Sequence, residues 1–545
     1  MNVSTAVVEA LAAGGVETVF GVPGTQSLPL NEAIADHPDT EFVVARHETA
    51  VTHQAWGYAE TSGRPAATLV VPGPGDMNAM NGLRNALLDG TPMLHLAVET
   101  EPELRGGDAI HETPPDTYDN TVRENVTVET PEAAAVTVEQ ALATARTPPT
   151  GPVRVGIPKN FLRADRPLAE RSAPTPGAAS SPPAEAVASA ADLLAGADRP
   201  VVYAGGGVRR AGASDQLGAV AERLGAPVVT SYKGKGTLPE DHPASAGVLA
   251  GSASPELLDC LASADAALAV GTDLDAVATR GFEVEFPEAL VHVTLEPGDV
   301  GRGYQPALSV VADAGETLAA LDGALAERGV DGDPPERAAA VRAATEERVA
   351  ALLGDEPPIT SVRALQAVRA ALPRDAVVAV DAGGFRVWGL NTFEAYGPRS
   401  YVNPGSWATM GTGLPSAIGA AMAEPEGPVV ALTGDGGLLM CVHELHTAVA
   451  EGIPVTVVVL NNDDYAIISE EAARGYGLAD REYGWPETPV SFATVAEGMG
   501  MSAEWAATPG EVERAVAAAV GSAEPTLVEV RTDPDEPQAR PFMGT

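Results

Sequence analysis

Lysine is nearly absent from this chain, which has only Lys159, Lys233 and Lys235 among 545 residues. Arginine supplies the rest of the 33 basic residues, against 75 acidic residues, and the formal net charge is -42 at pH 7. Such a surface repels phosphate groups. We therefore expect neither a nucleic acid nor an anionic membrane as a partner.

Cysteine and long apolar runs are also scarce. The two cysteines, Cys260 and Cys441, lie far apart in sequence and match neither a disulfide framework nor a thiolate metal site. No run approaches the ~18 apolar residues that span a bilayer, and the first residues lack the basic and apolar parts of a secretion signal. We expect a cytoplasmic protein.

Hydrophobic residues make up 45% of the chain, an ordinary share for a folded protein and too high for one that its charge keeps disordered. The carboxylates must then cover a folded surface. High salt screens the repulsion between such charges to within a few ångströms. A folded protein this acidic and this poor in lysine indicates a halophilic cytoplasm.

Two breaks in composition divide the chain. Residues 166–185 are rich in Pro, Ser and Ala without periodicity, and residues 329–358 hold GVDGDPP, a short helical stretch and GDEPP. Both segments are predicted to be linkers. Three blocks remain, at residues 1–165, 186–328 and 359–545, and each is long enough to bury a core.

Each block alternates short β-branched apolar runs with Ala-rich helical stretches. The runs include AATLVV and PMLHLAV in the first block, PVVYAGG and AALAVG in the second, and PVVALTGDGG and IPVTVVVLNN in the third. Uninterrupted Val, Ile and Leu runs are typical of parallel sheets that helices cover on both faces. The sequence therefore predicts an α/β fold of three doubly wound parallel-sheet domains, with ligands at the carboxyl ends of strands.

A glycine-rich turn and an asparagine pair end two neighbouring predicted strands in the third block. GDGG at residues 434–437 follows one strand, and Asn461-Asn462 ends the next, with one helix and one strand between them. The two strand tips should meet at one edge of the sheet. Asp435 and Asn462 then offer oxygen ligands of the kind that Mg²⁺ prefers, and the glycines let a diphosphate approach the backbone. A simple turn would explain GDGG but not its spacing from the asparagines.

This arrangement is similar to the signature of thiamine-diphosphate-dependent enzymes. The resemblance extends over nearly the whole chain and is closest to the acetolactate synthase large subunit and related 2-oxo-acid decarboxylases. The motifs that carry it are FGVPG at 20–24, RHE at 46–48, PGPGDMNAMNGLRNALLDGTPML at 72–94, DAIHE at 108–112, GPVRVGIPKN at 151–160, GKGTLPEDHP at 234–243 and GSWATMGTGLPSAIGAA at 405–421. The resemblance implies a first block that binds the aminopyrimidine, a structural middle block, and a third block that binds diphosphate and metal.

The resemblance also assigns roles to single residues. It implies that Asp435, Asn462 and the backbone carbonyl of Asp464 hold Mg²⁺. Met410 resembles the apolar residue that wedges between the two cofactor rings, with a plain core residue as the alternative. The side chains of Asp463 and Asp464 are expected to face solvent. The implied cofactor contacts are Met410, Ala408, Gly383, Gly384, Gly434, Gly436, Gly437, Asn462 and Glu48.

Glu48 ends the RHE motif and is expected to open a helix. Alone it would be a carboxylate at a helix N-terminus, worth about 0.3–1 kcal/mol. The resemblance gives it a catalytic role, because the cofactor needs a carboxyl at its pyrimidine ring that promotes loss of the thiazolium C2 proton. We predict that Glu48 is that carboxyl.

Two further residues are catalytic candidates. His111 lies in DAIHE, where acetolactate synthases usually carry Gln, and could donate a proton after CO₂ leaves; a structural histidine is the alternative. Lys159 in IPKN matches a lysine near the substrate entrance and could pair with a substrate carboxylate; a surface ion pair is the alternative. The other histidines near these motifs are expected to pack or to face solvent: His47, His53, His443 and His446.

The middle block departs from the acetolactate synthase pattern. TDLDAVA at residues 272–278 replaces ARFDDRV, and AGSA at residues 250–253 replaces GMHG, so that two arginines are missing. AGGGV at residues 204–208 could cradle phosphate, but such turns are common in α/β proteins. FAD is therefore a possible cofactor that we doubt. Substrate choice is open too, since Glu99 replaces a Gln of the family.

The sequence thus predicts a thiamine-diphosphate- and Mg²⁺-dependent enzyme that decarboxylates a 2-oxo acid and ligates the product to a second one. The model for this is acetolactate synthase, which serves branched-chain amino acid biosynthesis. A non-ligating 2-oxo-acid decarboxylase, of the benzoylformate or pyruvate decarboxylase kind, is the alternative. A non-catalytic cofactor-binding homologue is disfavoured by Glu48, Asp435 and Asn462. The family pattern joins Glu48 of one subunit to Asp435 of another, so we expect a homodimer or homotetramer, with a regulatory subunit possible.

Overall fold

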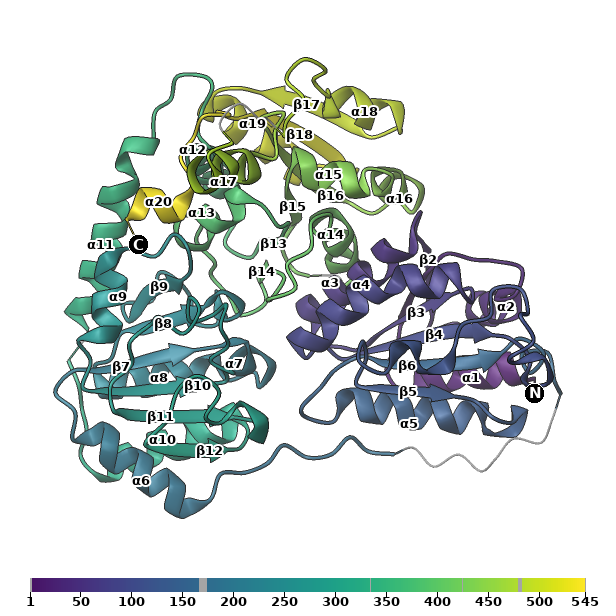
Figure 1. Ribbon diagram of the computed structural model, residues 1–545, viewed down its shortest axis with the longest axis horizontal. Coiled ribbons are helices and arrows are strands. Elements are labelled where there is room, and N and C mark those ends of the chain that lie inside the picture. Colours follow the sequence, from purple (N-terminus) through teal and green to yellow (C-terminus); the bar gives the residue numbers. More distant parts are fainter. Residues whose placement is uncertain (1, 166–173, 334, 424, 479–482, 545) are drawn as a thin grey trace.

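A computed structural model describes residues 2–165, 174–333, 335–423, 425–478 and 483–544 of the chain. It contains three parallel sheets of six strands each, with helices packed on their faces, and Figure 1 shows them as three lobes. The predicted fold class is therefore confirmed. Residues 166–173 of the first predicted linker lie outside the described residues.

The strands of each sheet follow one another along the chain. The first sheet has β1 (Thr18–Gly21), β2 (Glu41–Val44), β3 (Ala66–Val70), β4 (Met93–Glu99), β5 (Glu124–Thr127) and β6 (Val153–Pro158). The middle sheet has β7 (Pro200–Ala204), β8 (Val228–Ser231), β9 (Ser245–Leu249), β10 (Ala266–Val270), β11 (Ala289–Thr294) and β12 (Leu308–Val311). The third sheet has β13 (Val377–Val380), β14 (Tyr401–Val402), β15 (Val429–Gly434), β16 (Val455–Asn461), β17 (Ser502–Ala506) and β18 (Thr526–Arg531).

Helices connect these strands. Those of the first domain are α1 (Val3–Ala13), α2 (Leu28–Asp36), α3 (Glu48–Ser62), α4 (Pro74–Asp89) and α5 (Ala134–Arg146). Those of the middle domain are α6 (Ala184–Ala195), α7 (Gly206–Arg210), α8 (Ser214–Leu224), α9 (Pro255–Ala262) and α10 (Ala314–Glu327), followed by α11 (Glu336–Val349). Those of the third domain are α12 (Ser361–Ala371), α13 (Gly384–Thr392), α14 (Gly413–Met422), α15 (Asp435–Cys441), α16 (Glu444–Ala450), α17 (Ala466–Tyr476), α18 (Phe492–Gly498), α19 (Pro509–Val520) and α20 (Ala539–Met543).

The strand orders give each sheet one point at which a ligand-binding crevice is expected. The first and third sheets share one order, β2-β1-β3-β4-β6-β5 and β14-β13-β15-β16-β18-β17, whereas the middle sheet runs β12-β11-β10-β7-β8-β9. The chain changes its direction of winding between β1 and β3, between β13 and β15, and between β7 and β10. Ligands of doubly wound sheets bind at the carboxyl ends of strands beside these points. GDGG follows β15, so the predicted diphosphate motif lies at one of them.

The first and third domains are joined through α3 and α14, which pack backbone to backbone. A Cβ on Gly57 would lie 2.1 Å from the Ser416 carbonyl oxygen, and a Cβ on Gly419 would lie 1.8 Å from the Gln54 carbonyl oxygen. Only glycine fits at either position. The pairing is antiparallel, and apolar residues of both helices, such as Ala55 and Ile418, belong to one buried core.

Lys233 joins all three domains in one buried charge cluster. Its ammonium lies 3.0 Å from Asp89 and 3.3 Å from Glu60, both of the first domain, and donates to the Asn403 carbonyl of the third. Arg209 also pairs with Glu60. Burial raises the pKa of Glu60, but the charges of Arg209 and Lys233 outweigh burial and hold that pKa below its usual range. The cluster is thus a set of mutually paired buried charges.

The segment predicted as the second linker contains the packed helix α11. Ala338 and Val341 belong to the core of the middle domain, whereas Val349 belongs to that of the third domain. Figure 1 shows α11 running along both lobes. Within the described residues, no helix is both long and apolar enough to cross a membrane.

We predict that Lys233→Met destabilises the fold. The variant keeps the apolar stem of the side chain but leaves Asp89 without a buried cation at its carboxylate. Loss of one partner of a buried ion pair costs about 3–5 kcal/mol. Thermal and urea unfolding should show a clear loss, whereas Lys159→Met, which breaks the partly exposed pair with Glu101, should cost about 0–1 kcal/mol. Equal losses in the two variants would contradict this assignment.

Candidate active site

Asp435 and Asn462 meet at the edge of the third sheet, as their spacing predicts. Asp435 is the first residue of α15, and its carboxylate accepts hydrogen bonds from the backbone N–H groups of Gly436 at 2.7 Å, Asn462 at 3.2 Å and Asp464 at 3.3 Å. The side chain is buried. Burial raises the pKa of Asp435 to about 6, although these backbone donors act in the opposite direction.

These groups fit a hard divalent cation. A buried carboxylate without a cationic partner is costly, and a metal ion would offset that cost. The amide oxygen of Asn462 lies beside it and accepts from the Asp464 N–H at 3.2 Å. No group of three His, Cys, Asp or Glu side chains in the described part of the chain could hold a metal. The oxygens that the structure brings together here are thus the Asp435 carboxylate and the Asn462 amide oxygen.

The expectation that Asp463 faces solvent is wrong. Its side chain is buried and pairs with Arg531, and its backbone is left-handed, with φ at 58°. Arg531 ends β18, which neighbours β16, so the sheet brings the two together. Asp464 is half-buried, and its carboxylate accepts a hydrogen bond from the Ser469 hydroxyl at 2.8 Å. Both side chains therefore shape the loop after Asn462.

Met410 points at the glycine turn from the loop before α14. A Cβ on Gly436 would lie 3.2 Å from the Met410 methyl and 2.4 Å from the Tyr465 ring. Asp381, at the end of β13, holds this loop: its buried carboxylate accepts from the N–H groups of Gly411 at 2.9 Å and Thr412 at 3.3 Å. The sequence interpretation missed Asp381 and Tyr465, although Asp381 directly follows the run AVVAV at a predicted strand end.

The other predicted cofactor residues surround the same edge. Gly434 precedes α15, and Gly437 lies in its first turn, where a Cβ would come within 2.7 Å of the Asp381 carboxylate. Gly383 and Gly384 begin α13, directly after β13. Ala408 lies in the Met410 loop with φ at 39°. The third domain thus brings its predicted cofactor residues together.

Glu48 is the first residue of α3, as predicted. Its carboxylate accepts a hydrogen bond from the Asn78 side chain at 3.1 Å. Gly75 lies against it, since a Cβ at that position would be 3.0 Å from Glu48 Oε1. The glycine-rich start of α4 therefore forms one wall of the Glu48 environment.

His111 lies next to that wall. Its backbone is left-handed, with φ at 65°, and a Cβ on Gly73 would lie 2.8 Å from its carbonyl oxygen. Glu112 closes the loop by accepting from the N–H groups of Gly106 and Ala109. His111 itself is exposed. It lies against Gly73, two residues from the glycine that contacts Glu48.

Lys159 is already paired in this structure. Its ammonium lies 3.0 Å from Glu101, just beyond β4, and its side chain is 29% exposed. The surface ion pair that was the alternative prediction is therefore present. A substrate carboxylate at Lys159 would have to replace Glu101.

The residues just before Glu48 contact the segment after α15, whereas Asp435 begins that helix. Arg46 and His47 contact Glu444, His446 and His443, all beyond the C-terminal end of that helix. Asp435 is at its N-terminal end. A helix of this length spans about 10 Å.

The other histidines take structural positions. His53 is fully buried on α3, and burial lowers its pKa to about 4, so it is neutral. His443 packs against the His47 ring, and His446 accepts from Arg46. These contacts join the first and third domains.

The glycine run after β7 is explained by packing. Gly205 and Gly207 donate their N–H groups to the carbonyls of Val270 and Gly271, and a Cβ on Gly205 would lie 2.3 Å from the Gly271 oxygen. These amides are thus not free for a phosphate. Burial, together with the charges of Asp275 and Asp299, raises the pKa of the neighbouring Asp273 to about 6.

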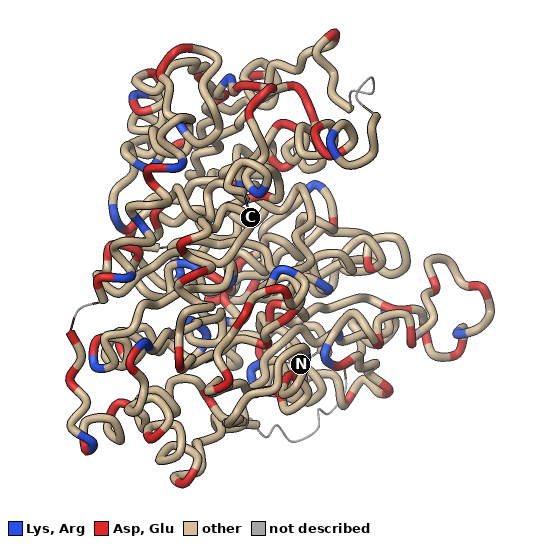
Figure 2. Tube along the Cα trace, turned by 60° about the vertical axis from the view of Figure 1, so that its left-hand side comes forward, with Lys and Arg blue, Asp and Glu red and all other residues tan. Residues whose placement is uncertain are grey.

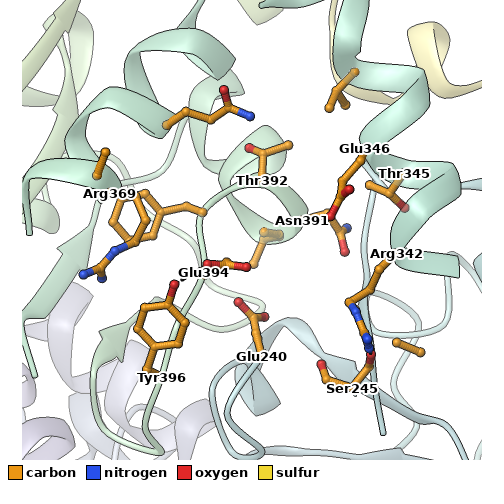
Figure 3. Close-up of a pocket in the computed structure, with 17 residues that line it drawn as sticks. Glu240, Ser245, Arg342, Thr345, Glu346, Arg369, Asn391, Thr392, Glu394 and Tyr396 are labelled. Carbon is orange, nitrogen blue, oxygen red and sulfur yellow. Dashed lines mark hydrogen bonds between the residues drawn. The ribbon is translucent and has the colours of Figure 1, made fainter. Parts of the chain in front are cut away.

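A cavity of about 450 Å³ lies elsewhere, among α11, α12 and α13. Figure 3 shows its lining, which includes the carboxylates of Glu240, Glu346 and Glu394. Arg342 donates to the Ser245 carbonyl, and Glu240 pairs with Lys235. None of the predicted site residues lines it.

We predict that Gly436→Ala weakens binding of thiamine diphosphate, the cofactor that the sequence resemblance implies. In a helix, alanine is favoured over glycine by about 1 kcal/mol, so any loss must come from crowding. The added methyl would displace Tyr465 or Met410 and fill the turn. Fluorescence titration should show about tenfold weaker binding. Gly298→Ala, where a Cβ meets nothing within 4 Å, is the control, and equal affinity in the two variants would contradict the prediction.

Comparison with known families gives matches along most of the chain. Residues 1–120 match the N-terminal TPP-binding domain of thiamine pyrophosphate enzymes. Residues 187–321 match the central domain, and residues 381–530 match the C-terminal TPP-binding domain. The order of these matches follows that of the three sheets.

Curated relatives align over nearly their whole length. A probable acetolactate synthase large subunit of Methanocaldococcus jannaschii is 30% identical over 98% of this chain and 93% of its own. The probable 2-ketoarginine decarboxylase AruI of Pseudomonas aeruginosa is 33% identical over 97% and 94%. The acetolactate synthase isozyme 1 large subunit of Escherichia coli is 28% identical over 97% and 94%. With Asp435, Asn462 and Met410 gathered at one sheet edge, these matches establish that the chain belongs to the thiamine pyrophosphate enzyme family.

Proposed function

We propose that this enzyme decarboxylates a 2-oxo acid and ligates the product to a second 2-oxo acid, in the manner of acetolactate synthase. The observation that carries the proposal is the contact of Asp435 with Asn462 in front of the Met410 loop. That cradle suits Mg²⁺ and a diphosphate. Similarity to acetolactate synthase large subunits over almost the full chain supports the substrate class.

The chain's residues would divide the work as follows. Asp435, Asn462 and the Asp464 carbonyl hold Mg²⁺, while Gly436 offers a backbone that a diphosphate can approach. When bound, thiamine diphosphate supplies a carbanion at its thiazolium C2 and takes up the electrons released by decarboxylation. Glu48 holds a proton at the pyrimidine ring, and His111 can supply one at the substrate carbon.

We propose that the active site forms between two chains. Because α3 and α14 run antiparallel, Glu48 at the start of α3 and the Met410 loop before α14 lie at opposite ends of this helix pair, and a second copy could bring one to the other. Exposed apolar side chains on α4, on α15 and in the Met410 loop support a homodimer: Met77 is 53% exposed, Met440 51% and Trp407 44%. Contact between two copies would bury them. Two such dimers would make a homotetramer, and a regulatory subunit could bind outside this contact.

A non-ligating decarboxylase is the second candidate. The relative with 33% identity is named for 2-ketoarginine, whose side chain is a cation. Two carboxylates, those of Glu99 and Glu101, lie at the carboxyl end of β4, where a guanidinium group could pair with them. In this case a proton rather than a second 2-oxo acid reacts with the decarboxylated carbon.

We propose further that the enzyme works without flavin in a salt-rich cytoplasm. The amides of Gly205 and Gly207 after β7 already have partners, and Asp273, Asp275 and Asp299 gather near them and would repel an anionic dinucleotide. Figure 2 shows acidic residues along the whole trace. High salt would screen the repulsion among them.

Products distinguish the two candidates. We expect that the protein with thiamine diphosphate, Mg²⁺ and pyruvate in high salt forms a product that yields acetoin after acid treatment. Free aldehyde from pyruvate or from 2-ketoarginine would favour the second candidate. Added FAD should leave the rate unchanged. No product from any 2-oxo acid, under conditions where the cofactor binds, would exclude both.

Glu48→Gln should abolish turnover while cofactor binding persists. The amide keeps the shape and can still accept from Asn78, but it cannot hold the proton as a carboxyl does. We expect kcat to fall by about 10²–10⁴-fold. Glu17→Gln, which alters an exposed ion pair with Arg64, is the control. Unchanged turnover in Glu48→Gln would contradict a mechanism that depends on the Glu48 carboxyl.

A further inference from the structure

A network of charged and polar side chains extends across the first sheet from the start of α4, next to Glu48. Asp76 follows Gly75 in the first turn of α4, and its carboxylate accepts from His95 at 2.9 Å and from Arg154 at 2.7 Å. Arg154 also donates to Glu99 at 2.9 Å. Glu99 in turn lies 3.6 Å from Arg105, the first residue of the loop that carries His111.

Most side chains of this network are buried, and their charged groups are paired. Asp76, His95 and Arg154 are each at most 1% exposed, and Arg154 stacks 4.2 Å above the Tyr118 ring. Burial by itself would raise the pKa of Asp76, but the His95 hydrogen bond and the Arg154 charge outweigh it and lower that pKa to about 2. A buried ion pair such as that of Asp76 and Arg154 adds little to the stability of the fold. Its role is therefore to position the residues around it.

The sequence makes room for Glu99 in a specific way. A Cβ at Gly156 of β6 would lie 2.0 Å from Glu99 Oε1, and the nearest atoms to it all belong to Glu99. Glycine at this strand position therefore leaves space for the carboxylate. Any side chain there would push Glu99 away from Arg154.

Both ends of this side-chain network reach the candidate active site. At one end, Gly75 touches the Glu48 carboxylate. At the other, Arg105 begins the loop of residues 105–114, in which His111 packs against Gly73. The start of α4 and the loop are thus tied to the same buried arginine.

We propose that Glu99 is a positioning residue that, through Arg154 and Arg105, holds the 105–114 loop and His111 against the glycine turn beside Glu48. This role rests on the proposed function, in which His111 supplies a proton near Glu48. Glu99 itself does not touch the reacting atoms. It acts by keeping the loop closed.

The test compares Glu99→Gln and Gly156→Ala with the wild type. The first removes the nearer of the two carboxylate charges that Arg105 faces, Glu129 at 3.8 Å being the other, and the second displaces the Glu99 carboxylate without changing it. Trypsin cleavage after Arg105, followed by mass spectrometry of the peptides that end there, reports loop opening. We expect cleavage to become about fivefold faster in both variants. Glu256→Gln, which breaks an exposed pair with Arg348 at 2.7 Å, should leave the rate unchanged.

Kinetics with a 2-oxo acid complete the test. We expect kcat to fall about tenfold, with KM and the affinity for thiamine diphosphate changed by less than about twofold, because only the loop is displaced. Unchanged cleavage after Arg105, or faster cleavage with unchanged kcat, would overturn the proposal. Failure of the proposed function would instead appear as no turnover in the wild type, and the cleavage rates would still decide whether Glu99 holds the loop.

Discussion

The backbone contact between α3 and α14 is the constraint on which the rest of the structure depends. Two glycines, Gly57 and Gly419, let each helix approach a carbonyl group of the other, and the cores of the first and third domains merge around them. Glu48 begins α3, and the Met410 loop leads into α14. The same contact therefore fixes where the carboxyl of one domain and the cofactor cradle of the other lie, and it places them apart within one chain.

Lysine is scarce in this chain, and two of the three lysines have a structural role. Two of the three lysines are largely buried: Lys233 joins the three domains, and Lys235 pairs with Glu240 while donating to the Leu390 carbonyl. A buried charge needs a partner, and in a chain with 75 acidic residues that partner is readily found. Acidic residues occur along the whole trace in Figure 2, and salt can screen those that are exposed.

The sequence predicted the central strands and the meeting of Asp435 with Asn462, because both follow from local rules. Continuous apolar runs mark strands buried on both faces, and parallel strand ends must meet, which brought Asp435 to Asn462. The edge strand β17 escaped notice, because it reads SAEWA, is largely exposed and lacks such a run. The contact of Arg154 with Asp76 escaped too, since 78 residues separate them; the register of β4 and β6 places Arg154 beside His95, which also contacts Asp76.

The carboxyl end of β4 holds two ion pairs that respond differently to salt. Lys159 and Glu101 are partly exposed, so high salt weakens their attraction, whereas Arg154 is shielded by protein on all sides. At high salt the ion pair of Lys159 and Glu101 can separate while Arg154 stays paired with Glu99. A substrate carboxylate could then compete with Glu101 for Lys159, and a cationic substrate could compete with Lys159 for Glu101, without loosening Arg154 and the elements it joins. The carboxyl end of β4 would thus combine an ion pair that a substrate can displace with a buried arginine that holds its neighbours in place.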